Sequence, residues 1–282
     1  MKIDKLGLVG RLKSKGQYEY KNFRVQGLYE SARLFTDRAV QRLCFSRFRT
    51  AMRPSLHQMT GAAQSVHTLA VDMVQTTFPA MSPAELKNIE EEYSTLRYEL
   101  DARCAAMSDR LEYPDWYAIE RETSFLYYSV CRHLAPEKVL ETGIANGHSS
   151  FFFLQAMKKN GKGSLHSVDI ADNVGKLLTE EERAGWNLHI LKSPQRRSFT
   201  RILEMVSPID MFVHDSDHTY GWQMFEYRVA HKALSHQGVL LSDDVDHSLA
   251  FFDFCEGINK KPSLLIDTRK VTGILLPETN NA

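Results

Sequence analysis

The spacing of apolar residues changes near residue 135 and divides the chain into two parts. In the first part, apolar side chains recur every three to four positions, the period of one helix face. This period predicts helices over residues 61–77 and 116–134, and a third that begins at Ser82, where Ser-Pro-Ala-Glu is typical of a capping box. An arginine-rich run over residues 28–49 has the same period. The N-terminal part is therefore expected to be helical.

In the second part, short apolar strands alternate with helices. The expected strands are residues 138–142, 164–170, 188–191, 209–214 and 238–242. The expected helices lie around 149–159, 174–184, 196–206 and 219–235. This alternation predicts a parallel, doubly wound sheet. Two further runs, 263–267 and 273–276, are separated by a short turn and are expected to pair antiparallel. The predicted fold is thus α/β and Rossmann-like, with a seven-stranded, mostly parallel sheet, an antiparallel last strand and a helical N-terminal extension.

Charge is distributed unevenly between the two parts. The 282 residues carry 35 basic and 35 acidic side chains, but residues 1–60 alone have a net charge of +9. We expect residues 1–112 to be a dimerisation or lid region that packs on an acidic domain over residues 113–282, and the chain to form a homo-oligomer through these helices. Peripheral membrane contact stays open as an alternative for the basic run. Nucleic acid is not an expected partner, because the chain has no known RNA-binding motif and its second part is acidic.

Cysteine usage and hydropathy indicate the compartment. The four cysteines are widely scattered and form no CxxC pair, which disfavours a zinc site or a disulfide framework. The first twenty residues lack the apolar stretch of a secretory signal, and no run approaches the roughly 20 apolar residues that span a bilayer. We expect a cytoplasmic protein.

A glycine-containing turn follows the first strand of the second part. Gly143 and Gly147 are four residues apart, and glycine permits both a tight turn and the close approach of a ligand. The helix after them offers free N–H groups to an anion. Ala145 stands where a dinucleotide fingerprint needs its middle glycine, which disfavours a dehydrogenase. The next strand ends in Asp169, a position suited to the hydroxyls of a ribose. A tight turn without a ligand is the alternative interpretation.

Acidic residues follow two later strands. Asp215 and Asp217 come after the fourth strand, and Asp243 and Asp244 after the fifth. Carboxylates gathered at one edge of a sheet repel each other unless a hard cation joins them, so we expect a bound metal. The alternative, a cap on the next helix, is expected to explain Asp217 or Asp246. His218 follows at the start of a helix, where an imidazole can act as general base at neutral pH.

Together these motifs resemble the class I S-adenosylmethionine-dependent O-methyltransferases. The pattern that carries the resemblance is Glu141-x-Gly143-x-x-x-Gly147-x-Ser149, Asp169, Asp215-x-Asp217-His218 and Ser242-Asp243-Asp244-Val245. It is most similar to the metal-dependent group that contains catechol and macrolide-sugar (macrocin-type) O-methyltransferases, over roughly residues 115–277. His218 and Asp244 stand where catechol enzymes have Lys and Asn, which favours the sugar-methylating branch.

The resemblance implies roles for individual residues. Residues Gly143, Gly147 and Ser149 would hold the methionine part of S-adenosylmethionine, Asp169 its ribose, and His218 would take the proton of the acceptor. The full set of expected cofactor-binding residues is Glu141, Gly143, Gly147, Ser149, Asp169 and Asp215. The expected ligands of Mg²⁺ or another divalent cation are Asp215, Asp243 and Asp244. The adenine-binding residues do not transfer from the family pattern.

The sequence therefore predicts an S-adenosylmethionine-dependent methyltransferase, acting with Mg²⁺ on a hydroxyl of a small molecule such as a sugar-bearing natural product. Two alternatives remain at this point. One is a nicotinamide-dependent oxidoreductase on a similar sheet. The other is a non-catalytic methyltransferase-like scaffold that binds cofactor or a partner protein. The substrate pocket is expected between the N-terminal helices and the segment after Asp244, including Phe251, Phe252 and Phe254.

Overall fold

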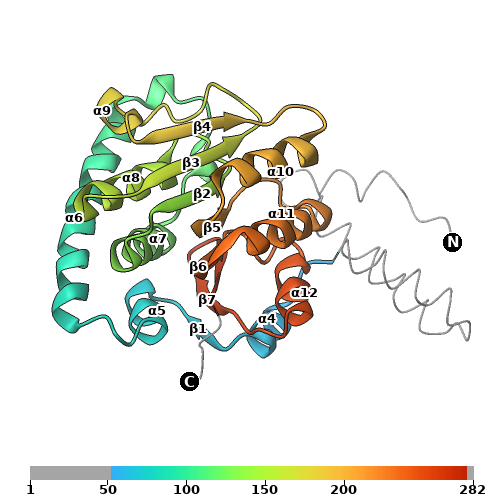
Figure 1. The fold of residues 1–282 in the computed structure, drawn as a ribbon. Coiled ribbons are helices and arrows are strands. Elements are labelled where there is room, and N and C mark those ends of the chain that lie inside the picture. Colours follow the sequence, from blue (N-terminus) through green and yellow to red (C-terminus); the bar gives the residue numbers. More distant parts are fainter. Residues whose placement is uncertain (1–51, 278–282) are drawn as a thin grey trace, which may run out of the picture.

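The computed structural model describes residues 52–277, which form one eight-stranded sheet with helices on both faces (Figure 1). The strand order is β1-β7-β8-β6-β5-β2-β3-β4. The strands are β1 (Ser65–His67), β2 (Lys138–Thr142), β3 (Ser164–Asp169), β4 (Trp186–Ile190), β5 (Ile209–His214), β6 (Leu234–Ser242), β7 (Ser263–Ile266) and β8 (Val271–Leu275). Every pairing is parallel except those of β8, which runs antiparallel to β6 and β7. The predicted Rossmann-like α/β fold and the antiparallel last strand are confirmed.

The helices divide between the two faces of the sheet (Figure 1). One face is covered by α5 (Ala70–Thr77), α6 (Pro83–Ala106), α7 (Arg121–Leu134) and α8 (His148–Asn160). The other is covered by α4 (Leu56–Ala62), α10 (Gln195–Val206), α11 (Tyr220–Ala233) and α12 (Ala250–Gly257). Three short helical turns, η1 (Ser108–Arg110), η2 (Asp115–Tyr117) and α9 (Glu180–Arg183), lie in the connections.

Each central strand supplies apolar side chains to both cores. In β2, Val139 packs with the α5–α8 layer while its neighbour Leu140 packs with the α10–α12 layer. In β5, Val213 and Phe212 divide in the same way. Successive side chains of a strand point to opposite faces, so a strand covered on both sides must be apolar at nearly every position. This requirement explains why the continuous apolar runs of the sequence predicted these strands.

Three local predictions are corrected. The sheet has eight strands among the described residues rather than seven, because Ser65–His67 pairs with β7 and interrupts the helix expected over 61–77. The helix expected over 174–184 is reduced to the four residues of α9. The Ser82 hydroxyl does accept a hydrogen bond from the Glu85 N–H, but the Glu85 carboxylate bonds to His133 instead of closing a capping box.

The basic run over residues 28–49, with the lid or dimerisation role expected for it, lies outside the described residues. The division at residue 112 stays a prediction. Residues on either side of it share one core, because Leu96 of α6 and Phe152 of α8 belong to the same buried cluster. Within residues 52–277, every helix is too short or too polar to cross a membrane.

Candidate active site

A cavity of about 1160 Å³ opens at the carboxyl ends of the parallel strands. Here β2 has β3 on one side and β5 on the other, so the connections leave the sheet in opposite directions and separate. The loops after β2, β3, β5 and β6 all contribute to the lining, through residues such as Gly143, Asp169, Asp215 and Asp244. The fold therefore brings the predicted motifs to one hollow.

The glycine turn has the backbone that its sequence requires. Gly143 and Gly147 have φ values of +80° and +95°, in the left-handed region that glycine tolerates. A Cβ on Gly143 would lie 1.9 Å from the backbone oxygen of Asp215, so the loops after β2 and β5 touch at this point. Gly147 is the N-cap residue of α8, and His148 and Ser149 in the first turn of that helix line the cavity.

Glu141 supports this turn from below. Its side chain is buried, and the carboxylate accepts hydrogen bonds from the hydroxyls of Ser149 (2.9 Å), Ser167 (2.6 Å) and Ser150. Burial raises the pKa of Glu141, and the three hydroxyls oppose that rise. Ser149 lines the cavity, whereas Glu141 is not among the lining residues. Glu141 thus lies beneath the cofactor loop rather than in the hollow.

Asp169 ends β3 and lines the cavity. One carboxylate oxygen accepts from the N–H of Ile144 in the glycine loop (2.9 Å). The other accepts from the N–H groups of Ile170 (2.7 Å) and Ala171 (3.0 Å). A carboxylate has about four acceptor positions, so one is still available for a ribose hydroxyl. The position is the one that the sequence predicted.

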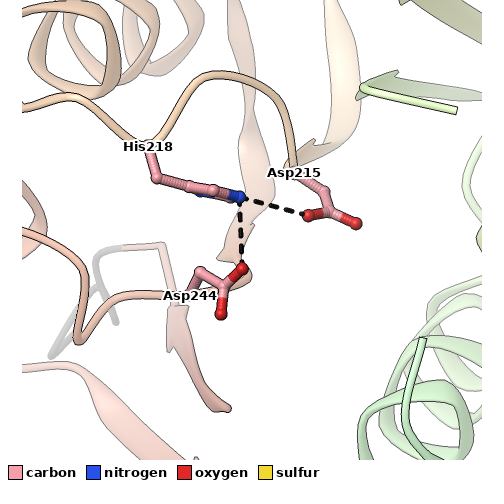
Figure 2. Close-up of side chains that lie close together, drawn as sticks. All are labelled: Asp215, His218 and Asp244. Carbon is pink, nitrogen blue, oxygen red and sulfur yellow. Dashed lines mark ion pairs between the residues drawn. The ribbon is translucent and has the colours of Figure 1, made fainter. Parts of the chain in front are cut away.

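Asp215, His218 and Asp244 converge on the wall next to the glycine turn (Figure 2). The Nε2 atom of His218 lies 3.2 Å from a carboxylate oxygen of Asp244 and 3.7 Å from one of Asp215. One ligand atom from each of the three residues falls within 4.8 Å of the others, a spacing that suits a metal ion. Two strands, β5 and β6, and the start of α11 position these groups.

Burial sets the protonation of this cluster. Burial, reinforced by the His214 ring, lowers the pKa of His218 to about 3, so the imidazole is neutral at neutral pH. Burial and the carboxylate of Asp243 raise the pKa of Asp215 well above its usual range. Burial also acts to raise the pKa of Asp244, but contacts with His247, His218 and Lys270 outweigh it and lower that pKa. A neutral imidazole between carboxylates can accept a proton or bind a cation.

Asp243, the third predicted ligand, lies outside this cluster of three side chains, and its role as a ligand stays a prediction. Its fully buried carboxylate contacts the Lys270 ammonium at 2.7 Å and accepts a hydrogen bond from the Thr272 hydroxyl at 3.0 Å. Both partners come from the end of the chain, Lys270 in the β7–β8 turn and Thr272 in β8. Asp244 follows with a left-handed φ of +51°, so the chain turns between the two aspartates and the Asp244 side chain lines the cavity.

Three groups at the site were given no role from the sequence, although His247 was the histidine beyond His218 most expected to have one. Lys270 lines the cavity, and its ammonium lies 3.5 Å from Asp244 as well as 2.7 Å from Asp243. His247, whose Nδ1 lies 3.3 Å from the second oxygen of Asp244, also lines it. Glu226 of α11 is fully buried and contributes to the lining at the floor of the hollow. Asp217, by contrast, accepts a hydrogen bond from the N–H of Thr219, which is itself the N-cap residue of α11, so the side-chain cap expected from Asp217 is not formed.

An aromatic rim was also missed. Trp116 and Tyr117 of η2 line the cavity with side chains 64% and 53% exposed, and Tyr113 packs edge-on against Tyr117. The side-chain amide of Asn146, in the glycine loop, holds both the N–H and the carbonyl of Tyr113. The predicted phenylalanines, Phe251, Phe252 and Phe254, are instead buried in the core under α12.

Comparison with known proteins agrees with this geometry. Residues 140–245 match a family model described as a methyltransferase domain. No curated protein matches the chain. Among solved structures, the chain is similar to the O-methyltransferase TomG from Streptomyces achromogenes in complex with SAM, at 16% identity, over 64% of this chain and 89% of that chain, with a TM-score of 0.50. It is also similar to cofactor-bound Rv0187 from MTB, at 13% identity, over 64% and 91% of the two chains, with a TM-score of 0.50.

The family match supports the predicted enzyme class, a methyltransferase. The likeness to the two solved structures is itself one of fold. The nicotinamide-dependent alternative has no support from either comparison. The matched residues run from β2 to the segment after β6 and so include the glycine turn, Asp169 and the Asp215–His218–Asp244 cluster.

Proposed function

We propose that the chain is an O-methyltransferase that moves the methyl group of S-adenosylmethionine to a hydroxyl of a small molecule, with a divalent cation held by Asp215 and Asp244. The observation that carries the proposal is the convergence of these two carboxylates and the neutral imidazole of His218 beside the glycine turn (Figure 2). The cofactor half would use Gly143, Gly147 and Ser149 for the methionine part and Asp169 for the ribose.

The charge of the site fits a divalent cation. Three carboxylates, Asp215, Asp243 and Asp244, face one ammonium, that of Lys270, which leaves two negative charges when all are ionised. Opposing carboxylates in a partly buried site repel each other unless a cation or a proton intervenes. Carboxylate oxygens are the ligands that Mg²⁺ prefers. These residues therefore fit the cation that the resemblance implies, with Asp243 neutralised by Lys270 and Asp215 with Asp244 open to the cavity.

The reaction follows from these charges. When bound, the cation would stabilise the deprotonated acceptor oxygen as a Lewis acid. The acceptor oxygen attacks the methyl carbon in line, the new O–C bond forms as the C–S bond breaks, and the sulfur keeps the electron pair. The acceptor's proton passes to Nε2 of His218, which lies 3.2 Å from a carboxylate oxygen of Asp244. Holding both reactants in this line supplies much of the rate.

The rim favours a ring-containing acceptor. Trp116, Tyr117 and Tyr113 present flat faces at the mouth of the hollow, and exposed aromatic side chains at a cavity commonly mark a binding surface. Both a sugar ring and an aromatic ring can pack on such faces. A sugar-bearing natural product remains the proposed class of acceptor.

The test is methyl transfer from labelled S-adenosylmethionine to a panel of sugars and phenols, with and without exhaustive chelation. We expect transfer to depend on added Mg²⁺ or Mn²⁺ and to fall at least roughly tenfold in His218→Ala, the low end for losing a positioned base. His166→Ala is the matched control, because that histidine pairs with His189 at the β3–β4 edge and does not line the cavity.

Different outcomes contradict different parts of the proposal. A wild-type rate in His218→Ala removes the base assignment. Full activity after chelation removes the cation. Cofactor binding without transfer to any hydroxyl favours the non-catalytic scaffold.

A further inference from the structure

We propose that Glu226 is a positioning residue that fixes the cofactor side of the cavity relative to the acceptor side. Glu226 lies on α11, and its side chain is fully buried. No motif in the sequence distinguishes it from an ordinary helix acid. The assignment rests on the hydrogen-bond donors that surround its carboxylate. One of its tests, the affinity for Mn²⁺, rests on the proposed function.

Four side chains donate to this one carboxylate. One oxygen accepts from the Thr142 hydroxyl at 2.9 Å and from Nδ1 of His214 at 2.6 Å. The other accepts from the Ser216 hydroxyl at 3.0 Å and from the Trp222 indole at 2.6 Å. An ionised carboxylate offers about four acceptor positions, so these donors satisfy it completely.

The donors come from the two loops that build the site. Thr142 ends β2 and immediately precedes Gly143 of the cofactor turn. His214 and Ser216 stand directly before and after Asp215 at the end of β5. A carboxylate that served only its own helix would bond within that helix, and only Trp222 does so here. Glu226 therefore ties the backbone that carries the cofactor turn to the backbone that carries a proposed cation ligand.

The loops after β2 and β5 are in close backbone contact, so a small shift of one loop changes its position relative to the other. A Cβ on Gly143 would lie 1.9 Å from the Asp215 oxygen, so the loops already meet backbone to backbone. Methyl transfer requires the sulfonium carbon and the attacking oxygen in line at close range, and misplacement by about 1 Å can cost on the order of 100-fold in rate. A tie between these loops acts on that distance directly.

The same carboxylate also orients His218. Because an ionised Glu226 can only accept, His214 must donate from Nδ1, which fixes the tautomer and the plane of its ring. The His214 ring packs edge-on against the His218 ring, with centroids 5.5 Å apart and planes at 86°. The hydrogen bond to Glu226 and the packing of the ring on Tyr227 hold this wall in place, so Glu226 helps to set the direction of His218 Nε2 through one intermediate.

The test is Glu226→Gln. The glutamine amide can lie in two orientations. In one, its NH₂ group faces the Trp222 indole and cannot accept a hydrogen bond from it; in the other, the NH₂ group faces Thr142 and His214, which must then accept instead of donate. We expect the affinity for Mn²⁺, measured by calorimetry, to fall about 10–100-fold, as for other partners that orient metal ligands. We also expect the ¹⁵N ring signals of His214 and His218 to shift.

The matched control is Glu92→Gln. Glu92 on α6 is also a multiply bonded carboxylate, which accepts from Tyr128 and Arg132 in the layer away from the cavity. The same chemical change there should lower the free energy of unfolding and leave Mn²⁺ affinity and the His218 signal unchanged. A purely structural role for Glu226 would make the two variants behave alike.

Two milder variants each remove one hydrogen bond to Glu226, and they test the proposal if Glu226→Gln does not fold. Thr142→Val is nearly isosteric and should weaken binding of S-adenosylhomocysteine more than binding of Mn²⁺. Ser216→Ala should do the reverse, because it loosens the residue next to Asp215. Unchanged affinities in both would overturn the assignment.

The failure of this inference is distinguishable from failure of the proposed function. If the wild-type chain binds no Mn²⁺, the cation proposal fails. The role of Glu226 is then decided by two other measurements that compare Glu226→Gln with the wild type: the affinity for S-adenosylhomocysteine and the ¹⁵N ring signal of His218. If the wild type binds Mn²⁺ and Glu226→Gln binds it within twofold, with the His218 signal unmoved, Glu226 is not a positioning residue.

Discussion

On the cofactor side of the cavity, Glu141 and Asp169 each accept hydrogen bonds from three neutral donors, hydroxyls for Glu141 and backbone N–H groups for Asp169. On the acceptor side, Asp215 and Asp244 instead face ionisable groups, a shared imidazole and the ammonium of Lys270. The first pair is satisfied by the fold alone, whereas the second pair retains charge that the fold does not neutralise.

This difference separates two kinds of preorganisation. Hydrogen bonds to neutral donors hold the cofactor turn in one shape before any ligand arrives, because each buried acceptor has a partner. The acceptor side keeps carboxylates close together at an electrostatic cost, which a cation would relieve. Strain of this kind is typical of functional sites rather than of structural ones. The comparison predicts that variants on the two sides fail in different ways.

The largest expected effect is on stability, at Asp243. Asp243→Ala would leave the buried Lys270 ammonium without its closest partner, and breaking a buried ion pair from one side typically costs about 3–5 kcal/mol. The free energy of unfolding, measured in urea, should fall by that amount. Glu91→Ala is the control, since its pair with Lys87 is exposed and should contribute less than about 0.5 kcal/mol. A loss below 1 kcal/mol at Asp243 would contradict the structural role.

This expectation also shows why the sequence did not separate Asp243 from Asp244. Two consecutive aspartates at a strand end look equivalent along the chain. Their roles diverge because Lys270, 27 residues later, contacts the first at 2.7 Å. The sequence predicted the edge of the sheet at which acidic groups gather, since the strands are marked by local apolar runs. It could not predict the pairing, which depends on a turn between two other strands.

Most of the fold was predictable because local apolar runs mark the strands. The exceptions are features that depend on residues distant in the sequence. Lys138–Thr142 and Ile209–His214 begin and end where the apolar runs predicted. Ser65–His67 was missed because its one apolar residue, Val66, is 37% exposed, and the segment is a strand only by pairing with β7. Glu226 was missed because a helix acid carries no sign of the distant hydroxyl and imidazole donors that fold onto it.

The next largest effect is expected at Asp244. Asp244→Asn keeps the shape, and asparagine tolerates the left-handed φ of +51° at this position. Because it keeps an oxygen ligand but removes one negative charge from the site, Mn²⁺ affinity should fall about 10–100-fold. The stability of the fold should change little. Calorimetry with MnCl₂ measures the loss.

Asp169→Asn is the control from the other side of the cavity. It should weaken S-adenosylhomocysteine binding and leave Mn²⁺ affinity unchanged. Equal losses of both ligands in both variants would mean that the two sides are not separate, and the comparison would fail.

The smallest expected effect concerns pH and the cofactor side. Burial lowers the pKa of His148, the first residue of α8, to about 4 from an ordinary value of 6.5. As pH falls from 7 to 5, the unfolded chain therefore binds a proton at this histidine that the folded chain does not. The contribution is intact above pH 6.5 and is lost progressively below it, by about 2 kcal/mol at pH 5.

The measurement is the difference between wild type and His148→Gln in urea unfolding at pH 7 and pH 5. Other histidines with lowered pKa values, His166, His189 and His218, act in the same direction, so only this difference isolates His148. The variant should lose less stability on acidification than the wild type does. A parallel loss in both proteins would show that His148 takes up a proton in the folded state. In that case the loss of stability between pH 7 and pH 5 would come from groups other than His148.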